Sequence, residues 1–400
     1  MRRNGRTILL AVTSDVSLSL MTGFPAYLVS QGWDVHVVSA PGPKLQALAE
    51  QGGVSVHALE MRRDPAPLDD LRSLISWFRL LRKVRPDVMS VGTPKAGLLG
   101  SIAGLLTRVP ARVYLLRGLR YETTAGLKRS FLLGLEKLSA ACSHKVVAVS
   151  ESLRKTAVAD GVSPPHKMVV IGSGSSNGVD MERFAMTTEE RTQAQNDRWP
   201  NDVRPVVGFI GRIHPDKGLD LLADAAEILA TDRVAGRLLV VGESDAAEGE
   251  ALKERLRSSP WEVELVGSTQ DIVPFLRLMD VLCLPTLREG FPNVVLEAAA
   301  AGIPTVATAA TGVVDAVVDG TTGLICADRD PRLLAGHLAW LLGDPGRRTT
   351  LGENALSLTG TEFSQLLVWQ GAEGFYARVT AANQAVPRRG QDRLPPKTRS

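Results

Sequence analysis

The sequence predicts an α/β protein with two doubly wound domains, each built on a parallel sheet, that face each other across a cleft. Short apolar runs alternate with helical patterns from end to end, which is typical of parallel sheets covered by helices on both faces. The alternation breaks once, near residue 180, and then restarts. A length of 400 residues also exceeds one ordinary core and suits two domains.

The apolar runs predict strands in both halves of the chain. In the first half they lie at 7–12, 34–39, 54–58, 87–90, 111–116, 145–149 and 168–171, with helical patterns over 68–85 and 125–141. In the second half they lie at 205–210, 237–241, 263–266, 281–284, 305–307 and 323–326, with helical patterns over 219–230 and 331–342. Ligands of such sheets bind at the carboxyl ends of strands, so functional residues are expected in the strand-to-helix loops.

Gly, Ser and Asn residues over 172–180, followed by a polar stretch to residue 202, predict a linker. A GxGxxG dinucleotide fingerprint fails here because Asn177 stands where the third glycine belongs and no apolar helix follows. We expect a first domain over 1–180, a second over 181–362 and a last helix over 363–381. The Pro- and Arg-rich tail over 382–400 is expected to be disordered.

The composition excludes several classes of protein. Hydrophobic residues make up 44% and charged residues 22%, the mix of a folded chain. No apolar run reaches the roughly 18 residues of a membrane-spanning helix. The three cysteines, Cys142, Cys283 and Cys326, lie far apart without a CxxC pair, which argues against a disulfide framework or a zinc site and favours the reducing cytoplasm.

Basic and acidic residues are distributed unevenly between the two halves of the chain. Residues 1–180 hold 23 Lys and Arg against 13 Asp and Glu, whereas residues 181–382 hold 18 against 29. The basic half suits an anionic membrane surface or an anionic acceptor, and uneven surface charge is the alternative. The helical pattern over 125–141 places Lys128, Arg129 and Lys137 beside Phe131 and other apolar residues. A peripheral membrane contact and an ordinary amphipathic core helix both remain open for it.

The most informative segment runs from Leu284 to Pro304. A strand ends at Leu284, a turn follows, and a helix-forming run begins near Asn293, which we expect to be its N-cap. Free N–H groups at a helix start suit a diphosphate. Glu289 is placed to accept hydrogen bonds from sugar hydroxyls and Glu297 from those of a ribose. The alternatives are a solvated loop charge for Glu289 and a complement to the helix dipole for Glu297.

A second loop, over 208–219, also follows a predicted strand. Its Arg212 and Lys217 supply two cations that can offset a leaving diphosphate without a metal, and a pair of surface cations is the alternative. Two further loops follow strands at Gly242 and at Gly267, where glycine allows a close approach of ligand to backbone.

These motifs resemble the donor domain of family 4 glycosyltransferases, which have the GT-B fold. That family carries a G-R-x-x-x-x-K-G loop and a Glu-x7-Glu motif, which correspond here to 211–218 and to Glu289 and Glu297. The flanking E-G-F-P-N-V-V-L-E-A-A-A-A-G-I-P run is specific, and the linker Asn177-Gly178-Val179-Asp180 matches as well. The resemblance covers most of residues 7–380.

The resemblance implies two Rossmann-like domains, a nucleotide-sugar donor, transfer of a hexosyl group with retention, no required metal, and a last helix that crosses back to the first domain. It assigns the diphosphate to Arg212 and Lys217, the donor sugar to Glu289 and the ribose to Glu297, and the first three form the expected catalytic set. The implied donor-binding residues are Gly211, Gly242, Glu243, Val266, Gly267, Gly290, Phe291, Pro292, Asn293, Val294, Val295 and Glu297.

The first domain departs from many relatives of that family. The loop after its first strand, 13–19, lacks paired glycines, and the segment 115–122 lacks a histidine. The loops of the first domain resemble instead those of bacterial surface-polysaccharide transferases that act on polyprenyl-diphosphate-linked sugars. The expected acceptor-binding residues are Ser14, Thr93, Lys95, Arg117 and Arg120, with surface charge as the alternative for each cation.

The predicted function is that of a cytoplasmic retaining glycosyltransferase that moves a sugar from a UDP-linked donor to a lipid-linked or glycan acceptor during surface polysaccharide biosynthesis. No cofactor, metal or nucleic acid is expected, since histidines lack metal-ligand spacing and the basic tail has no aromatic-rich module beside it. The alternatives are a nucleotide-sugar 2-epimerase of the same architecture and a non-catalytic sugar-nucleotide-binding subunit. The Glu-x7-Glu motif with Arg212 and Lys217 favours transfer.

Overall fold

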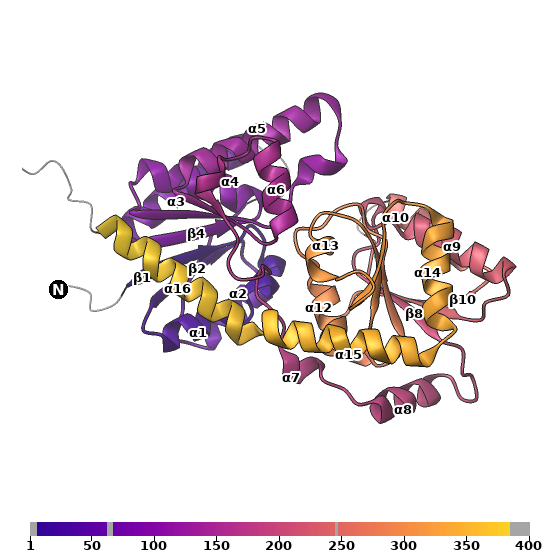
Figure 1. The fold of residues 1–400 in the computed structure, drawn as a ribbon. Coiled ribbons are helices and arrows are strands. Elements are labelled where there is room, and N and C mark those ends of the chain that lie inside the picture. Colours follow the sequence, from indigo (N-terminus) through magenta and orange to yellow (C-terminus); the bar gives the residue numbers. More distant parts are fainter. Residues whose placement is uncertain (1–5, 62–66, 245–246, 385–400) are drawn as a thin grey trace, which may run out of the picture.

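The computed structural model describes residues 6–61, 67–244 and 247–384. Its strands form two separate sheets, both entirely parallel. The first has seven strands in the order β3-β2-β1-β4-β5-β6-β7, and the second has six in the order β10-β9-β8-β11-β12-β13. Two doubly wound, Rossmann-like domains are therefore confirmed (Figure 1).

The first domain follows the predicted alternation closely. Its strands are β1 Thr7–Ala11, β2 Asp34–Ser39, β3 Ser55–Ala58, β4 Val88–Gly92, β5 Ala111–Leu116, β6 Lys145–Ala148 and β7 Met168–Val169. Its α-helices are α1 Phe24–Ser30, α2 Pro43–Glu50, α3 Pro67–Val84, α4 Pro94–Leu106, α5 Gly126–Cys142 and α6 Glu151–Ala159, and its 3-10 turns are η1 Asp15–Met21, η2 Arg120–Thr123 and η3 Pro165–Lys167.

The second domain repeats this architecture. Its strands are β8 Val206–Ile210, β9 Arg237–Val241, β10 Glu262–Val266, β11 Val281–Leu284, β12 Thr305–Thr308 and β13 Gly323–Cys326. Its helices are α7 Met181–Phe184, α8 Thr188–Arg198, α9 Leu219–Thr231, α10 Ala247–Arg257, α11 Val273–Leu276, α12 Asn293–Ala300, α13 Val313–Ala316, α14 Pro331–Leu342 and α15 Pro345–Glu362, with the 3-10 turn η4 Pro215–Lys217.

Helices cover both faces of the first sheet. Helices α3, α4 and α5 form one layer, and α1 and α16 (Gln365–Gln384) lie against the other face (Figure 1). All five residues of β1 are buried, as expected for a central strand that is covered on both faces. Within the described part of the chain, no helix is both long and apolar enough to cross a membrane.

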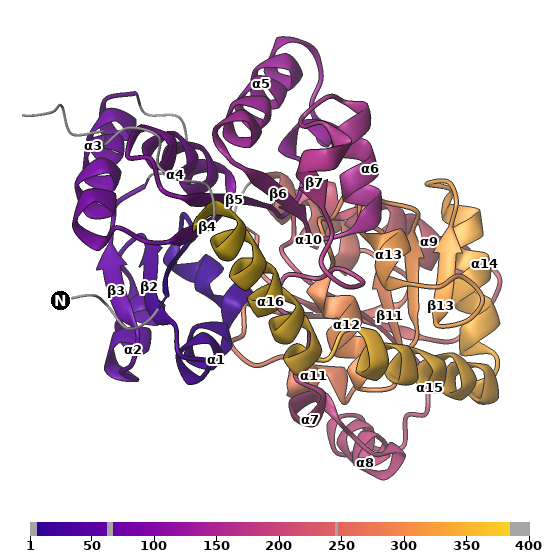
Figure 2. The same ribbon diagram turned by 60° about the vertical axis from the view of Figure 1, so that its left-hand side comes forward.

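The last helix returns the chain to the first domain, as Figure 2 shows for α16. The backbone N–H of Val179 donates to the carbonyl of Phe363, and the N–H of Gln365 donates to the carbonyl of Val179, so the two crossings run side by side. Trp369 Nε1 donates to Asn177 Oδ1 at 2.8 Å. The helix expected over 363–381 thus begins at Gln365 and continues to Gln384; the rest of the expected tail lies outside the described residues.

The apolar periodicity of the sequence does not predict α15. Its buried face consists of Leu351, Gly352, Ala355 and Thr359, and only the first of these is a large apolar residue. Asp344 caps this helix by accepting hydrogen bonds from the backbone N–H groups of residues 346 and 347.

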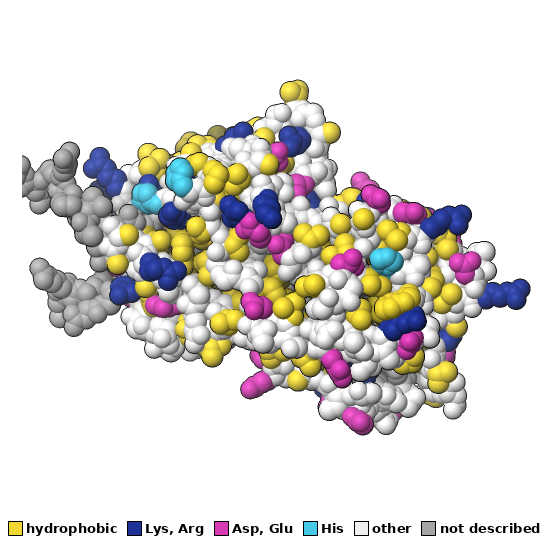
Figure 3. All heavy atoms as spheres, in the orientation of Figure 1, with side chains coloured by type: hydrophobic (Ala, Val, Ile, Leu, Met, Phe, Trp, Pro, Cys, Tyr) yellow, Lys and Arg dark blue, Asp and Glu magenta, His cyan; other side chains and the backbone are white. Residues whose placement is uncertain are grey.

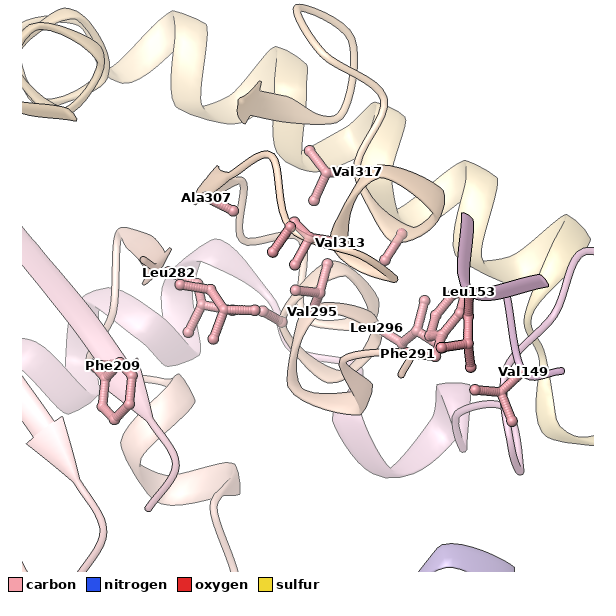
Figure 4. Packing of buried hydrophobic residues seen from close by; sticks show 14 of the residues in the cluster. Val149, Leu153, Phe209, Leu282, Phe291, Val295, Leu296, Ala307, Val313 and Val317 are labelled. Atoms are coloured by element: carbon pink, nitrogen blue, oxygen red, sulfur yellow. The ribbon is translucent and has the colours of Figure 1, made fainter. Parts of the chain in front are cut away.

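The two domains touch directly at the base of the cleft. Phe291 and Leu296 of the second domain pack near Val149 and Leu153 of the first, within one continuous apolar cluster (Figure 4). Ser150 Oγ donates to the carbonyl of residue 290 at 2.8 Å. Burial of large apolar side chains stabilises this contact by roughly 1.5–3 kcal/mol each, so it sets how the two cleft walls face each other.

Candidate active site

Both sheets reverse their strand order beside their first strand, between β1 and β4 in the first domain and between β8 and β11 in the second. Loops that leave two adjacent strands at such a point diverge and open a crevice. Loops from both reversal points line one cavity of about 720 Å³ between the domains. The site therefore has two walls, one from each sheet.

In the second domain, the loops after β8 and β11 are bonded to each other. The carbonyl of Asp216 accepts a hydrogen bond from Leu287 N at 2.9 Å and one from Thr286 Oγ1 at 3.0 Å. Gly218 has a φ of +70°, and a Cβ atom there would lie 1.9 Å from the carbonyl oxygen of Pro285. Only glycine fits this crossing, which fixes the η4 turn against the loop that carries Glu289.

Lys217 and Glu289 are brought together by this arrangement. Lys217 Nζ lies 2.5 Å from Glu289 Oε1, and the two side chains are 18% and 15% exposed. The backbone N–H of Glu289 also donates to the carbonyl of Thr311 at 3.0 Å. Removal of either partner from a largely buried ion pair destabilises the folded protein, because the remaining charge is left without a counter-charge.

Arg212 and Arg288 line the cavity from the second domain. Arg288 Nη2 lies 3.1 Å from Asp216 Oδ2, and its Nε donates to Thr123 Oγ1 of the first domain at 3.0 Å. His214 Nδ1 lies 2.6 Å from the other carboxylate oxygen of Asp216. Arg288 was not predicted from the sequence, although its position directly before Glu289 was a usable signal.

The prediction that Asn293 is the N-cap of α12 is wrong. Pro292 occupies the cap position, because the helix begins at Asn293, and Asn293 Oδ1 is buried without a hydrogen-bond partner among the described residues. Val295 N donates to the carbonyl of Pro292 at 3.0 Å, whereas no described group accepts from the N–H of Asn293 or Val294. The backbone from Asn293 to Val295 was expected to contact phosphate. Of its three N–H groups, those of Asn293 and Val294 are open to a ligand.

The glycines expected at the donor site lie at three neighbouring strand ends. Gly211 N donates to the carbonyl of Val241, and Gly242 N donates to the carbonyl of Val266, each at 2.9 Å. A Cβ atom on Gly242 would lie 1.8 Å from the carbonyl oxygen of Gly211, so a side chain cannot be accommodated. Gly267 follows at the end of the third strand.

Three other expected donor-site residues have different surroundings. Gly290 lies against the first domain, since a Cβ atom there would be 1.9 Å from the carbonyl oxygen of Arg117. Glu243 is paired with Lys253 of α10. Glu297 lies on α12, which packs against α7, and burial raises its pKa to about 7 although the charge of Arg183 opposes the shift.

In the first domain, the loops after β1 and β4 are joined by threonines. Thr13 Oγ1 and Thr93 Oγ1 lie 2.7 Å apart, and Thr13 N donates to Thr93 Oγ1 at 2.8 Å. Thr93 has a φ of +68°, which is strained for a β-branched residue. These bonds fix the strained turn that carries Thr93 and Lys95 to the cleft.

The expected cations of this wall differ in their surroundings. Lys95 Nζ lies 2.5 Å from Asp70 Oδ1, while Arg120 is exposed. Arg117 is half-buried, and the loss of solvent around its guanidinium lowers its pKa to about 10. Its Nη1 donates to the carbonyl of Leu20 at 3.5 Å, and its Nε has no described partner. A half-buried guanidinium whose buried Nε donor is unused is a suitable site for an anionic oxygen.

The cavity thus brings together all five residues expected at the acceptor site, Ser14, Thr93, Lys95, Arg117 and Arg120, with Arg212 and Arg288 from the opposite wall. Lys217 and Glu289 are not among its lining residues; they lie in the loops that carry Arg212 and Arg288. Tyr114 and Glu136 also line the cavity and were not selected from the sequence. Across residues 6–61, 67–244 and 247–384, no group of three His, Cys, Asp or Glu side chains could hold a metal ion.

Comparison with known protein families matches both domains. Residues 204–344 match the family described as "Glycosyl transferases group 1", and residues 24–174 match the "Glycosyl transferase 4-like domain". The chain is 35% identical to the capsular polysaccharide biosynthesis glycosyltransferase CapM of Staphylococcus aureus, over 91% of this chain and 95% of that protein. It is 25% identical to the UDP-Gal:alpha-D-GlcNAc-diphosphoundecaprenol alpha-1,3-galactosyltransferase of Escherichia coli, over 71% and 74% of the two chains.

Solved structures share the fold at lower identity. HepE from Anabaena, crystallised with UDP and glucose, superposes with a TM-score of 0.74 at 19% identity, over 92% of this chain and 99% of that one. Sucrose-phosphate synthase from Thermosynechococcus elongatus gives a TM-score of 0.75 at 19% identity, over 94% and 100%. With two matched domains, the G-R and Glu-x7-Glu motifs in place and the shared fold, the chain belongs to glycosyltransferase family 4 and is a glycosyltransferase of the GT-B type.

Proposed function

We propose that this glycosyltransferase transfers a sugar, with retention, from a UDP-linked donor to a lipid-linked or glycan acceptor during surface polysaccharide biosynthesis. The observation that carries the proposal is the 720 Å³ cavity, whose two walls supply cations from different domains. Cations on both sides of one cavity suit a reaction in which a diphosphate leaves on one side and an anionic acceptor is held on the other.

On the donor side, Arg212 and Lys217 would offset the charge that develops on the leaving diphosphate. The open N–H groups of Asn293 and Val294 at the start of α12 would hold a phosphate oxygen. Glu289 would accept hydrogen bonds from the donor sugar while Lys217 keeps its carboxylate in place. Positioning and charge stabilisation would then supply most of the catalysis, with neither a metal nor a carboxylate nucleophile.

The identities of donor and acceptor rest on the relatives. The Escherichia coli relative is named for a UDP-galactose donor and a diphosphoundecaprenol-linked acceptor, and HepE was crystallised with UDP. A diphosphate on the acceptor suits Lys95, Arg117 and Arg120, because these three cations line the same cavity, although Lys95 is also paired with Asp70.

We also propose a peripheral contact of the layer α3–α5 with an anionic membrane surface in the cytoplasm. Large apolar side chains are exposed on it, namely Leu68, Leu71, Ile75, Leu105, Leu106, Leu127, Phe131 and Leu138. Exposed cations accompany them, whereas none of the Asp and Glu residues in 67–142 is exposed. In Figure 3 hydrophobic and cationic side chains lie over the region of α5, with acidic side chains beside them. Such a surface favours anionic lipid headgroups.

Sedimentation with vesicles tests this contact. Vesicles of phosphatidylglycerol should retain the protein and vesicles of phosphatidylcholine should not. Leu127→Ser with Phe131→Ser should weaken retention several-fold, while Leu366→Ser, at a site on α16 that is as exposed as Phe131, should leave it unchanged. Equal retention by both lipids, or no effect of the α5 substitutions, contradicts the proposed contact.

A donor panel tests the proposed reaction. UDP-, GDP- and ADP-sugars are compared by thermal shift, and only UDP-sugars should raise the melting temperature, because a selective ligand stabilises the folded state. The selected donor is then incubated with a lipid extract, and a product one sugar heavier is expected by mass spectrometry. Conversion of the donor without an acceptor would indicate an epimerase, and binding without turnover would indicate a non-catalytic subunit.

A further inference from the structure

Glu136 differs from every other charged residue on the cavity wall. The remaining charged lining residues described there are the cations Lys95, Arg117, Arg120, Arg212 and Arg288, and Glu136 is the only carboxylate among them. It lies on α5 and is 8% exposed. A carboxylate that served only to neutralise this wall would form an ion pair, but no described cation lies within 4.0 Å of it.

The two oxygens of Glu136 have different surroundings. Oε2 accepts a hydrogen bond from the Tyr114 hydroxyl at 2.6 Å, and Tyr114 itself lines the cavity from β5. Oε1 accepts no hydrogen bond from a described residue. It is also not one of the fully buried side-chain atoms that lack a hydrogen-bond partner, so it keeps some accessible surface. Oε1 is therefore left facing the cavity, with Tyr114 holding the carboxylate in one orientation.

Tyr114 is held in turn by α4. A Cβ atom on Gly97 would lie 2.5 Å from Tyr114 Cε2, so the ring packs directly on the helix backbone at a position where glycine leaves room. A carboxylate fixed in this way presents one acceptor oxygen in a defined direction, which suits the hydroxyl group of a ligand rather than a phosphate.

We propose that Glu136 and Tyr114 form a subsite for the hydroxyl-bearing, uncharged sugar ring of the acceptor, while Lys95, Arg117 and Arg120 hold the anionic group attached to that ring. The inference rests on the proposed function, since it divides the acceptor site of that reaction into a polyol end and a phosphate end. Glu136 would act as a positioning residue that selects acceptors by a ring hydroxyl.

The charge state of Glu136 supplies a readout. Burial raises its pKa to about 7, and the Tyr114 hydrogen bond and the charge of Arg120 oppose that shift. The titratable groups that interact with it are Tyr114 from β5 and Arg120 and Tyr121 from η2, and Lys95 of α4 lines the same cavity while paired with Asp70. Only the ionised carboxylate accepts through both oxygens, so binding of a ring hydroxyl should strengthen as pH rises through 7.

The test uses the full chain, the UDP-sugar selected above and, as acceptor probe, a short-chain polyprenyl diphosphate that carries N-acetylglucosamine. Glu136→Gln should raise the KM for this acceptor about tenfold or more and leave the UDP dissociation constant within twofold. In the wild type, kcat/KM for the acceptor should fall below pH 7, and in Glu136→Gln this dependence should disappear. Melting temperatures verify that each variant is folded.

Tyr114→Phe provides a second, independent variant. Without the donated hydrogen bond the carboxylate is less stabilised, so the break in the pH profile should move to higher pH, with about a threefold rise in acceptor KM. An unchanged KM and pH profile in both variants would overturn the subsite while leaving the proposed function intact. A wild-type protein that binds UDP but transfers nothing to the probe would refute the acceptor class, and the subsite with it; failure to bind UDP would refute the proposed donor.

Discussion

The two walls of the cleft are built by the same device but carry charge differently. In each domain, hydroxyls or carbonyls join the loops of two strands at the point where strand order reverses, through Thr13 and Thr93 in the first and through Asp216 and Thr286 in the second. The second wall pairs its own charges, as Lys217 with Glu289. The first wall also pairs Lys95 with Asp70, but it leaves the buried Nε of the half-buried Arg117 without an acceptor. The catalytic charges of the second wall are therefore held in place before a ligand binds, whereas the first wall needs a ligand to supply the acceptor for Arg117.

Removing the paired carboxylate of the second wall should have the largest effect. Glu289→Gln leaves Lys217 largely buried without its counter-charge and removes the expected acceptor for donor-sugar hydroxyls. Transfer should fall about 10²–10³-fold in kcat, the range seen when one well-placed electrostatic group is removed from an active site. Steady-state kinetics with varied donor measure this.

The matched control is Glu250→Gln, which removes an exposed carboxylate from the pairing with Lys253 on α10. Its kcat should stay within twofold of wild type, because exposed ion pairs contribute little. Equal losses in both variants would show that the internal pairing of the second wall has no special role.

Disturbing the contact between the walls should come next. In Gly290→Ala the new methyl group would lie 1.9 Å from the carbonyl oxygen of Arg117, so the domains must move apart. A misplacement of about 1 Å between reacting groups costs about a hundredfold in rate, and kcat should fall by about that factor. Each domain should keep its fold, as circular dichroism can verify.

Gly336→Ala is the control for this backbone change. Gly336 lies on the exposed face of α14, and a Cβ atom there meets nothing within 4 Å. The substitution should leave kcat unchanged and stabilise the helix by about 0.5–1 kcal/mol. Full activity in Gly290→Ala would mean that the wall-to-wall contact does not set the catalytic geometry.

A smaller effect is expected when a cation of the first wall is removed. Arg117→Met should raise the acceptor KM about tenfold and leave UDP affinity unchanged, because hydrogen bonds to charged groups contribute about 1.5–3 kcal/mol. Lys155→Met, at an exposed cation of α6 outside the cavity, should change neither quantity. Weaker UDP binding in Arg117→Met would place the donor, not the acceptor, on this wall.

The smallest expected effect concerns stability and pH. The pKa of Glu297 is raised to about 7 in the folded state, so the folded protein binds more protons than the unfolded chain between about pH 4.5 and 7. The contribution of Glu297 to stability is therefore present at low pH and is lost as pH rises through 7. Glu297→Gln should melt a few degrees higher than wild type at pH 8 without UDP, and the difference should shrink at pH 5.

The fold was predictable because its signals are local. Each strand is a short apolar run and most helices carry an apolar stripe, so both parallel sheets follow from the alternation alone. Helix α15 was not predicted, because its buried face consists mostly of small or polar residues, which form no apolar stripe. The cap of α12 was misassigned because Pro292 and Asn293 are adjacent and both are compatible with a helix start.

The second wall was predictable for a similar reason, since its residues lie in two short motifs, each of which follows a strand. The residues of the first wall lie between Thr13 and Glu136 and meet only through the fold. Arg117, Arg120 and Lys95 could be selected because they follow strands. Glu136 gave no such signal: it lies within a helix, and only the packing of α5 brings it to the cavity.

A crystal structure of the protein with a UDP-sugar and a non-reactive acceptor diphosphate tests the division of the cleft most directly. The donor diphosphate should lie within hydrogen-bond distance of Arg212, Lys217 and the N–H of Asn293, and the acceptor diphosphate should contact Arg117 and Arg120. A donor diphosphate bound to Arg117, or two ligands in separate cavities, would contradict a single cleft with a donor wall and an acceptor wall.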